Sequence, residues 1–352
     1  MKILHIAWGL QVGGLESMLI DILNTQAIEH DISLIIINDE VDQRLLAAID
    51  VKVQVFLVRR PRQGINPYYW FRFLYYVVKI RPDIFHVHQD AILSLLRFFK
   101  QSKVVTFHDT GINPTQALRF ADQVFCISQA VLADISEKLP NVRLKVVENG
   151  IPVDKFWVRT EYANNDFNIV QVGRLDHIKK GQDILLYALA ELIRLNLGVD
   201  IKLDFIGDGP SKNELQNLAE SLHVKEQCRF IGTLPREYIY QHLRDYDLLV
   251  QPSRFEGFGL TVAEAMAAKI PVLVADIEGP MEIIAQGEYG YFFKVDDASA
   301  CANEIAKIIK VRTESAFLNA MEAARQRVFN QYDVSNTAKL YLIEYKKLLN
   351  AS

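Results

Sequence analysis

The sequence contains a segment in which an apolar strand, a glycine-containing loop and a helix follow one another directly: LLVQPSRFEGFGLTVAEAMAA, residues 248–268. Leu248–Val250 form a short continuous apolar run, which is typical of a parallel strand covered on both faces. Leu260–Ala268 then has the pattern of a helix. A strand that leads straight into a helix is the building unit of a parallel α/β sheet, so the segment predicts this class of fold.

The same strand-to-helix unit recurs along the whole chain. Its repetition predicts an α/β protein with doubly wound parallel sheets. In the N-terminal half the expected strands are Lys2–Ala7, Ile32–Ile37, Val51–Val58, Ile84–Val87, Val104–His108, Val124–Ile127 and Leu144–Val147, and the expected helices include Glu16–Asn24, Tyr68–Lys79 and Ala130–Leu139.

A polar interval, Glu148–Asp166, interrupts this alternation. It contains Asn149-Gly150, Pro152 and the polar run Ala163–Asp166, which together are typical of a linker. A second series of strands follows it: Phe167–Val172, Ile201–Ile206, Cys228–Ile231, Leu248–Val250 and Val272–Val274.

Two Rossmann-like domains are therefore predicted, residues 1–155 and residues 156–330. The stretch from about Ala302 to Leu349 has a helical pattern that breaks near Tyr332-Asp333. We expect residues 331–352 to form a C-terminal helix that packs back on the N-terminal domain.

Composition excludes several classes of protein. Half of the 352 residues are hydrophobic and the net charge of −4 is too small to indicate a nucleic-acid partner. The three cysteines are an odd number without C-x-x-C spacing, so we expect buried, inert thiols and neither disulfides nor a zinc site. The sequence lacks a secretory signal and an apolar run of about 20 residues, so we expect a cytoplasmic protein without a membrane span.

Ligands of open α/β sheets bind at the carboxyl ends of the strands, so the loops there are the first places to search for a site. Gly13 and Gly14, after the first strand, let backbone N–H groups at a helix start approach an anion. The spacing fits neither the dinucleotide fingerprint nor the P-loop. A tight turn without a ligand is the alternative interpretation.

His108 stands at the end of its strand, where a histidine binds substrate or transfers a proton. A histidine satisfied by its neighbours is the alternative. His86 and His88 have a similar position with less to distinguish them. Because no carboxylate lies at ligand spacing, we expect no metal on these three histidines.

The first strand of the second half ends in Gly173-Arg174, and Lys180-Gly181 follows shortly. Arg174 can place two donors on phosphate oxygens and Lys180 adds a point charge. Each charge-assisted hydrogen bond contributes about 1.5–3 kcal/mol. The pair therefore predicts a diphosphate site, with a solvated basic turn as the alternative.

The next strand is followed by Gly207-Asp208-Gly209-Pro210 and by Ser211, which we expect to cap a helix. The backbone of this turn either approaches a ligand closely or forms a tight turn without a ligand, and the sequence is compatible with both.

The loop before the helix at Leu260 combines an anion site with two acceptors. Gly257 and Gly259 allow backbone N–H groups to be exposed at the helix start. The carboxylates of Glu256 and Glu264 suit sugar hydroxyls, because they repel phosphate. A ligand with hydroxyls at both ends and a diphosphate between them, such as a nucleotide sugar, matches this pattern.

These motifs, in this order, resemble the retaining glycosyltransferases of the GT-B fold, specifically glycosyltransferase family four. The resemblance runs over nearly the whole chain, and its most specific part is Pro-Ser-x-x-Glu-Gly-Phe-Gly-Leu with Glu256 and Glu264. The other motifs are Gly13-Gly14-Leu15-Glu16, Phe107-His108, Asn149-Gly150, Gly173-Arg174 with Lys180-Gly181, and Gly207-Asp208-Gly209-Pro210.

The resemblance implies a role for each matching residue. Arg174 and Lys180 would bind the donor diphosphate, Glu256 the donor sugar, Glu264 the ribose, and His108 would lie beside the anomeric carbon. Further donor contacts would come from Gly13, Gly14, Gly173, Gly207, Gly257, Phe258, Gly259 and Leu260, with the base near Thr233 and Leu234.

The resemblance also implies retention of anomeric configuration and no cofactor, the nucleotide sugar being a co-substrate. The resemblance further implies that no divalent metal takes part. One departure from the family is Glu278-Gly279-Pro280-Met281-Glu282, in which Pro280 replaces a glycine and removes an N–H donor.

The segment Arg59–Tyr76 gathers basic and aromatic residues. Such a composition suits contact with anionic lipid or a lipid-linked acceptor. Burial of one helix face in the core is the alternative, and both can hold in part.

The leading hypothesis is transfer of a hexose from a nucleotide sugar, UDP before GDP, to a glycan or lipid-linked acceptor, as in lipopolysaccharide or capsule biosynthesis. A nucleotide-sugar epimerase, a phosphorylase of the same fold and a non-catalytic nucleotide-sugar-binding subunit are the alternatives.

Overall fold

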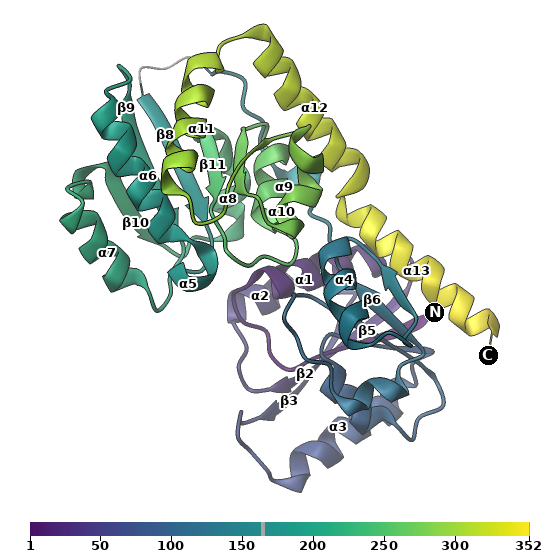
Figure 1. Ribbon diagram of the computed structural model, residues 1–352. Coiled ribbons are helices and arrows are strands. Elements are labelled where there is room, and N and C mark those ends of the chain that lie inside the picture. The colour runs from purple at the N-terminus through teal and green to yellow at the C-terminus, as the bar shows by residue number, and fades with distance from the viewer. Residues whose placement is uncertain (163–165, 352) are drawn as a thin grey trace. The chain divides into compact units, whose positions relative to one another are not determined.

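The structure is a computed structural model that describes residues 1–162 and 166–351 (Figure 1). It divides into two compact units. Unit 1 is Met1–Ile151 together with the last helix, α13 (Val334–Ala351), and unit 2 is Pro152–Asp333. Of the polar run expected at Ala163–Asp166, residues 163–165 lie outside the described residues and Asp166 begins β8.

Unit 1 is built on one parallel seven-stranded sheet with the order β3-β2-β1-β4-β5-β6-β7. Its strands are β1 (Lys2–Ala7), β2 (Asp31–Asn38), β3 (Gln54–Arg60), β4 (Ile84–Val87), β5 (Ser102–Phe107), β6 (Gln123–Cys126) and β7 (Leu144–Val146). Its helices are α1 (Gly14–Gln26), α2 (Gln43–Ala47), α3 (Pro67–Ile80), α4 (Gln129–Lys138) and α13, with 3₁₀ turns η1 (Asp90–Leu96) and η2 (Gln116–Phe120).

Unit 2 has a parallel six-stranded sheet with the order β10-β9-β8-β11-β12-β13. Its strands are β8 (Asp166–Val172), β9 (Asp200–Ile206), β10 (Cys228–Gly232), β11 (Leu248–Gln251), β12 (Val272–Ala275) and β13 (Tyr291–Phe293). Its helices are α5 (His177–Lys180), α6 (Gln182–Leu195), α7 (Lys212–Ser221), α8 (Arg236–His242), α9 (Leu260–Ala267), α10 (Glu278–Ile283), α11 (Ala298–Val311) and α12 (Ser315–Gln331), with 3₁₀ turns η3 (Val153–Lys155), η4 (Lys225–Gln227), η5 (Leu243–Asp245) and η6 (Ala285–Gly287).

The two sheets reverse their strand order at equivalent places, which confirms the predicted pair of doubly wound domains. The reversal falls between β1 and β4 in unit 1 and between β8 and β11 in unit 2. In this topology the loops after those strands open a crevice for ligands. The loops beginning at Trp8, His88, Gly173 and Pro252 are therefore the ones placed to carry chemistry.

Burial explains why the strands are almost wholly apolar. In unit 2 the strand side chains pack against helices such as α6 and α11, which contact each other on one side of the sheet (Figure 1). The resulting core includes Phe167, Ile169, Leu203, Phe205, Leu248, Val250, Leu185, Leu189, Ile305 and Ile308.

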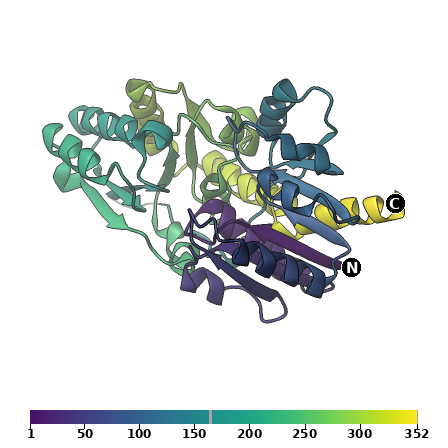
Figure 2. The same cartoon turned by 90° about the horizontal axis from the view of Figure 1, so that it is seen from below.

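Helix α13 belongs to unit 1. It packs against α1, and Figure 2 shows it lying along unit 1 close to the N-terminus. The Tyr341 and Tyr345 side chains are fully buried, and the Lys145 ammonium pairs with Glu344 at 2.5 Å. The chain leaves unit 1 at Ile151, whose carbonyl accepts from Val334 N–H at 2.9 Å, four residues before the expected limit of 155.

One expected strand was placed too early and one strand was not expected. β3 begins at Gln54 rather than Val51, because Asp50 holds the preceding residues in a turn: its carboxylate accepts from Lys52 N–H and its carbonyl from Val53 N–H. β13, which completes the sheet of unit 2, was not predicted. It is only three residues long, and its apolar run follows a glycine without a long flanking pattern.

Candidate functional site

The loops after β8, β9 and β10 contact one another along one edge of unit 2. Gly173 N–H donates to the Ile206 carbonyl at 2.9 Å, and Gly207 N–H donates to the Gly232 carbonyl at 2.9 Å. Leu175 N–H also reaches the Asp208 carbonyl at 3.1 Å. The turns predicted from Gly173 and Gly207 therefore form one continuous surface.

Two glycines are required by this contact between loops. At Gly207 (φ 144°) a Cβ atom would lie 2.0 Å from the Gly173 carbonyl oxygen. At Gly181 (φ 66°) it would lie 1.9 Å from the Pro252 carbonyl oxygen. Both positions combine a backbone conformation that favours glycine with no space for a side chain. The second contact joins the β8 loop to the β11 loop.

Lys180 and Glu256 meet at this junction. The Lys180 Nζ lies 2.5 Å from Glu256 Oε2, and both side chains are mostly buried. Lys180 ends α5, and Glu256 lies in the loop between β11 and α9. The structure thus brings together the two residues that were predicted to hold the charged and the sugar ends of a donor.

A polar network behind this pair was not predicted. Gln251 Nε2 donates to Glu256 Oε2 at 3.0 Å and to Ser253 Oγ at 2.8 Å, while Gln251 Oε1 accepts from the Thr261 hydroxyl at 3.0 Å. Gln251 is fully buried. A buried amide that ends an otherwise apolar strand was the available signal. The hydrogen bond from Gln251 orients the Glu256 carboxylate.

The two arginines of this region differ in their partners. Arg254 makes bidentate hydrogen bonds to the Asp183 carboxylate at 2.9 and 2.8 Å and a third bond to Asp296 at 2.5 Å. These bonds raise the pKa of the Arg254 guanidinium. Arg174 is exposed, and its guanidinium has no bonded partner in the part of the chain that the structure describes. Arg254 therefore holds the loop in place, whereas Arg174 is available to an anion.

The start of α9 presents unused backbone donors. Gly259 caps the helix with φ 105°, and the N–H groups of Phe258, Gly259 and Leu260 have no acceptor among residues 1–162 and 166–351. The Phe258 ring is buried and packs edge-on to Tyr332 at 5.5 Å. Glu264 lies one turn into the helix and is half-buried.

Pro280 does not disturb the neighbouring turn. It is the third residue of α10, in the first turn, where an N–H has no partner within the helix. Gly279 beside it is needed for packing, because a Cβ atom there would lie 2.5 Å from the Glu256 carbonyl oxygen. The departure from the family pattern therefore preserves the close approach of this turn to the Glu256 loop.

Two smaller expectations concern the loops after β9 and β10. Ser211 stands at the N-cap position of α7 but makes no capping bond; its hydroxyl instead bonds to the His177 ring at 2.9 Å, so the capping prediction was wrong. Thr233 is exposed and Leu234 half-buried directly after β10.

In unit 1, Gly13 caps α1 and Gly14 begins it. Glu16 follows in the first turn, and burial raises the pKa of its carboxyl. A Cβ atom at Gly13 would lie 2.6 Å from a Glu16 carboxylate oxygen, so this acidic side chain occupies the space beside the helix start. A phosphate at this position would have to share it with Glu16.

His108 follows β5, as predicted, and bonds to His88 rather than standing alone. The distance from His108 Nε2 to His88 Nδ1 is 3.0 Å. Burial lowers the pKa of the His108 imidazole to about 4, so the ring is neutral at pH 7. His86 bonds to the Thr106 hydroxyl at 2.8 Å.

The segment Arg59–Tyr76 forms the end of β3, a turn and most of α3. Only Phe73 and Val77 of α3 are buried, which is the expected packing of one face. Arg60 lies between the rings of Trp8 and Trp70 and is part of that packing. The other face carries exposed apolar side chains, here called the α3 surface: Ile65, Tyr68, Phe71, Leu74, Tyr75 and Val78.

Two further expectations concern the thiols and the membrane. Cys126 and Cys301 are buried, but Cys228, on edge strand β10, is only half-buried, so that part of the prediction was wrong. Burial raises the pKa of the Cys126 and Cys228 thiols to about 12. No helix within the described residues has the length and apolar content needed to cross a bilayer.

Two family models match the chain, Glycosyltransferase Family 4 over residues 12–155 and Glycosyl transferases group 1 over residues 156–327. Together they span nearly all of it. The chain belongs to glycosyltransferase family four, and its two Rossmann-like units are those of the GT-B fold. It is therefore a glycosyltransferase, as the sequence predicted.

Similar proteins come from several organisms. The N-acetyl-alpha-D-glucosaminyl L-malate synthase of Bacillus anthracis is 27% identical over 294 residues, which are 76% of this chain and 75% of that protein. A glycosyltransferase of Rickettsia africae has the same fold, with a TM-score of 0.84 at 20% identity over 100% of this chain and 99% of the other. Anabaena HepE, crystallised with UDP and glucose, gives a TM-score of 0.81 at 21% identity over 99% and 100%.

Proposed function

We propose that this glycosyltransferase moves a hexose from a nucleotide sugar, with UDP preferred to GDP, to a cell-surface glycan or a lipid-linked precursor, with retention of anomeric configuration. The observation that carries the proposal is the pairing of Lys180 with Glu256 beside the start of α9. A cation for phosphate and an acceptor for hydroxyls lie next to each other, which is the arrangement that a sugar diphosphate requires.

In this proposal the cationic groups of the site bind the diphosphate of the donor. The diphosphate carries negative charge that grows as the nucleotide leaves, and fixed donors aimed at that charge lower the barrier. Arg174 is exposed and has no bonded partner in the described structure, so it supplies a second cation at little reorganisation. The N–H groups at the start of α9 add a third source of positive potential.

The carboxylates would bind the ends of the donor. Glu256, oriented by Gln251, accepts from sugar hydroxyls once Lys180 turns toward the diphosphate. Glu264 accepts from the ribose, the loop at Thr233 and Leu234 borders the base, and we assign His108 to the donor sugar on the family resemblance. No metal takes part in this scheme, because cationic side chains and backbone N–H groups supply the positive charge.

The names of similar proteins favour UDP. Anabaena HepE was crystallised with UDP and UDP-glucose, and a Staphylococcus aureus TarM structure also holds UDP. The structure of the WaaB lipopolysaccharide outer core galactosyltransferase is a further match, with a TM-score of 0.75. These proteins support the choice of UDP-hexose and of a cell-envelope acceptor for the first assays.

The test is nucleotide release from UDP-glucose, UDP-galactose, UDP-N-acetylglucosamine and GDP-mannose, each with pooled lipid and glycan extracts as acceptor. We expect one UDP-hexose to be turned over only when acceptor is present, with a product whose anomeric configuration, read by NMR, equals that of the donor. Inversion would refute retention. Epimerised donor would favour the epimerase alternative, and binding without turnover would favour the non-catalytic one.

We also infer that the α3 surface contacts an anionic membrane, which brings the enzyme to a lipid-linked acceptor. Phe71 is 71% exposed and Tyr75 62% exposed, and Arg59 and Lys79 are exposed on the same strand-to-helix segment. Aromatic side chains beside basic ones suit the boundary between head groups and acyl chains.

Vesicle flotation tests this inference. Vesicles with anionic lipid should carry the protein upward and neutral vesicles should not. The double substitution Phe71→Ser and Tyr75→Ser should abolish flotation, while Phe329→Ser, an exposed aromatic of α12, should not. Equal flotation of all three proteins would contradict a membrane role for the α3 surface.

A further inference from the structure

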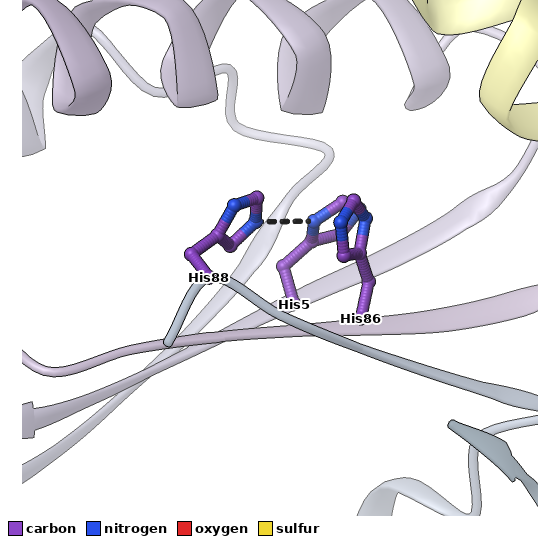
Figure 3. Close-up of side chains that lie close together, drawn as sticks. All are labelled: His5, His86 and His88. Atoms are coloured by element: carbon purple, nitrogen blue, oxygen red, sulfur yellow. Dashed lines mark hydrogen bonds between the residues drawn. The ribbon is translucent and has the colours of Figure 1, made fainter. Parts of the chain in front are cut away.

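Four histidines of unit 1 lie on neighbouring strands at one end of the sheet. His5 is in β1 and stands directly opposite His86 of β4, with His88 just after β4 and His108 just after β5. Figure 3 shows His5, His86 and His88 gathered together, with a bond from His88 to His5. His5, His86 and His88 are buried.

Three of these rings form a continuous hydrogen-bonded chain that begins at Gln26, the last residue of α1. Gln26 Oε1 lies 3.0 Å from His5 Nε2, and His5 Nδ1 lies 3.2 Å from His88 Nε2. His88 Nδ1 then lies 3.0 Å from His108 Nε2. The far nitrogen, His108 Nδ1, is shielded from solvent and has no partner within the described residues.

All of these rings are neutral at physiological pH. Burial lowers the pKa of the His5 and His108 imidazoles to about 4 and that of His88 well below its usual range. A neutral imidazole has one N–H donor and one acceptor nitrogen. A chain of neutral imidazoles must therefore point its N–H groups in one direction.

Gln26 sets that direction. In the orientation that the Gln26 amide takes in the structure, Oε1 faces His5 and can only accept, so the proton of His5 is on Nε2 and His5 Nδ1 is an acceptor. That acceptor requires the His88 proton on Nε2, and His88 Nδ1 in turn requires the His108 proton on Nε2. Each ring fixes the tautomer of the next.

We propose that Gln26, His5 and His88 form a tautomer relay that holds His108 protonated on Nε2, so that the unpartnered Nδ1 of His108 is the acceptor end of the chain. Gln26 is a positioning residue, since it acts on the ligand only through the three rings. The tautomer follows from unit 1 alone, whereas the use of the His108 Nδ1 lone pair by a sugar hydroxyl rests on the proposed function.

A metal ion is the competing explanation for the cluster, since the ligand atoms of His5, His86 and His88 lie within 4.8 Å of one another. Metal binding would need a free lone pair on each ring. The nitrogens of His5 and His88 are used by the relay. Those of His86 bond to the Tyr345 hydroxyl at 2.5 Å and the Thr106 hydroxyl at 2.8 Å. The hydrogen bonds thus account for every ring nitrogen of His5, His86 and His88 without an ion.

The direct test is ¹⁵N NMR of the histidine-labelled wild-type protein, which separates protonated from unprotonated ring nitrogens and needs no substitution at Gln26. We expect His5, His88 and His108 all to be protonated on Nε2. A proton on His108 Nδ1, or a tautomer mixture at His108, overturns the relay. Stoichiometric binding of Zn²⁺ with loss of these signals also overturns it.

Two substitutions test the source of the direction. Gln26→Met removes the acceptor and should give mixed tautomers at His108, with kcat/KM lowered about tenfold, the loss of one ligand hydrogen bond. Gln26→Glu keeps an acceptor and at pH 8 should retain the tautomer and most of the activity. Identical spectra and rates for the Met variant and wild type contradict the proposal.

The relay and the proposed function fail in different ways. If the tautomers are as expected but His108→Gln turns over the donor at the wild-type rate, the relay stands and the assignment of His108 to the sugar is wrong. If the wild-type tautomer is reversed while His108→Gln is inactive, the assignment stands and the relay is wrong.

Discussion

Replacement of Lys180 by alanine isolates the charge that the account places on the departing diphosphate. In the unliganded chain the Lys180 ammonium pairs with Glu256, which keeps a second bond from Gln251. Loss of the lysine therefore leaves Glu256 with a partner, and we expect the free energy of unfolding to fall by only about 1 kcal/mol. Removal of one preorganised donor to a developing charge costs about 3 kcal/mol of transition-state stabilisation, or roughly a hundredfold in turnover.

The assay is nucleotide release at saturating donor, together with urea unfolding of the same sample. Lys225→Ala is the matched control, because it removes the same charge from an exposed ion pair with Glu220. It should change turnover less than twofold. The diphosphate assignment is refuted if Lys180→Ala keeps more than about a third of the wild-type rate, or if its loss of activity is matched by loss of fold.

Three other predictions concern stability and metal independence. Asp247→Ala leaves Arg159 without its buried ion pair at 2.5 Å and Asn168 N–H without its acceptor, so the free energy of unfolding should fall by about 3–5 kcal/mol. The control Glu220→Ala, which breaks an exposed ion pair, should lower it by less than about 0.5 kcal/mol. Equal losses for the two variants in urea unfolding would contradict this prediction. The His5 pKa of about 4 in the folded chain lies below the unfolded value of about 6.5, so the unfolded chain binds more protons below pH 6.5 and stability should fall as pH is lowered, by about 2 kcal/mol from His5 at pH 5. The slope of unfolding free energy against pH should be shallower in His5→Asn, and an unchanged slope would show that His5 does not contribute. Turnover should survive EDTA treatment, and activity restored only by added Mg²⁺ or Mn²⁺ would place a metal in the mechanism.

Much of the fold followed from the sequence because buried parallel strands leave a strong local pattern. Nearly every strand of both sheets lies within a few residues of its predicted position. β13 was missed because three residues carry too little pattern, and β3 was extended too far because Asp50 closes a turn that apolar periodicity does not reveal.

The candidate site could be predicted from the sequence only in part. Lys180 and Glu256 were named, but their contact depends on how α5 and the β11 loop fold together. Gln251 was missed because its bonds to Ser253, Glu256 and Thr261 depend on how the β11 loop folds back on the end of its strand. The relay joins Gln26, His5, His88 and His108 across strands, and it depends on strand register, which a single sequence does not fix.

The central claim is that the loops after β8 and β11 hold the diphosphate of a nucleotide sugar. Calorimetric titration of UDP, UMP and uridine into the metal-free protein tests it most directly. We expect saturable one-to-one binding of UDP that is at least about tenfold tighter than that of UMP, since each added charge-assisted bond is worth about 1.5–3 kcal/mol. The advantage should be lost in Lys180→Ala and in Arg174→Gln and kept in Lys225→Ala. Equal affinity for UDP and UMP, or no binding of either, would contradict the account.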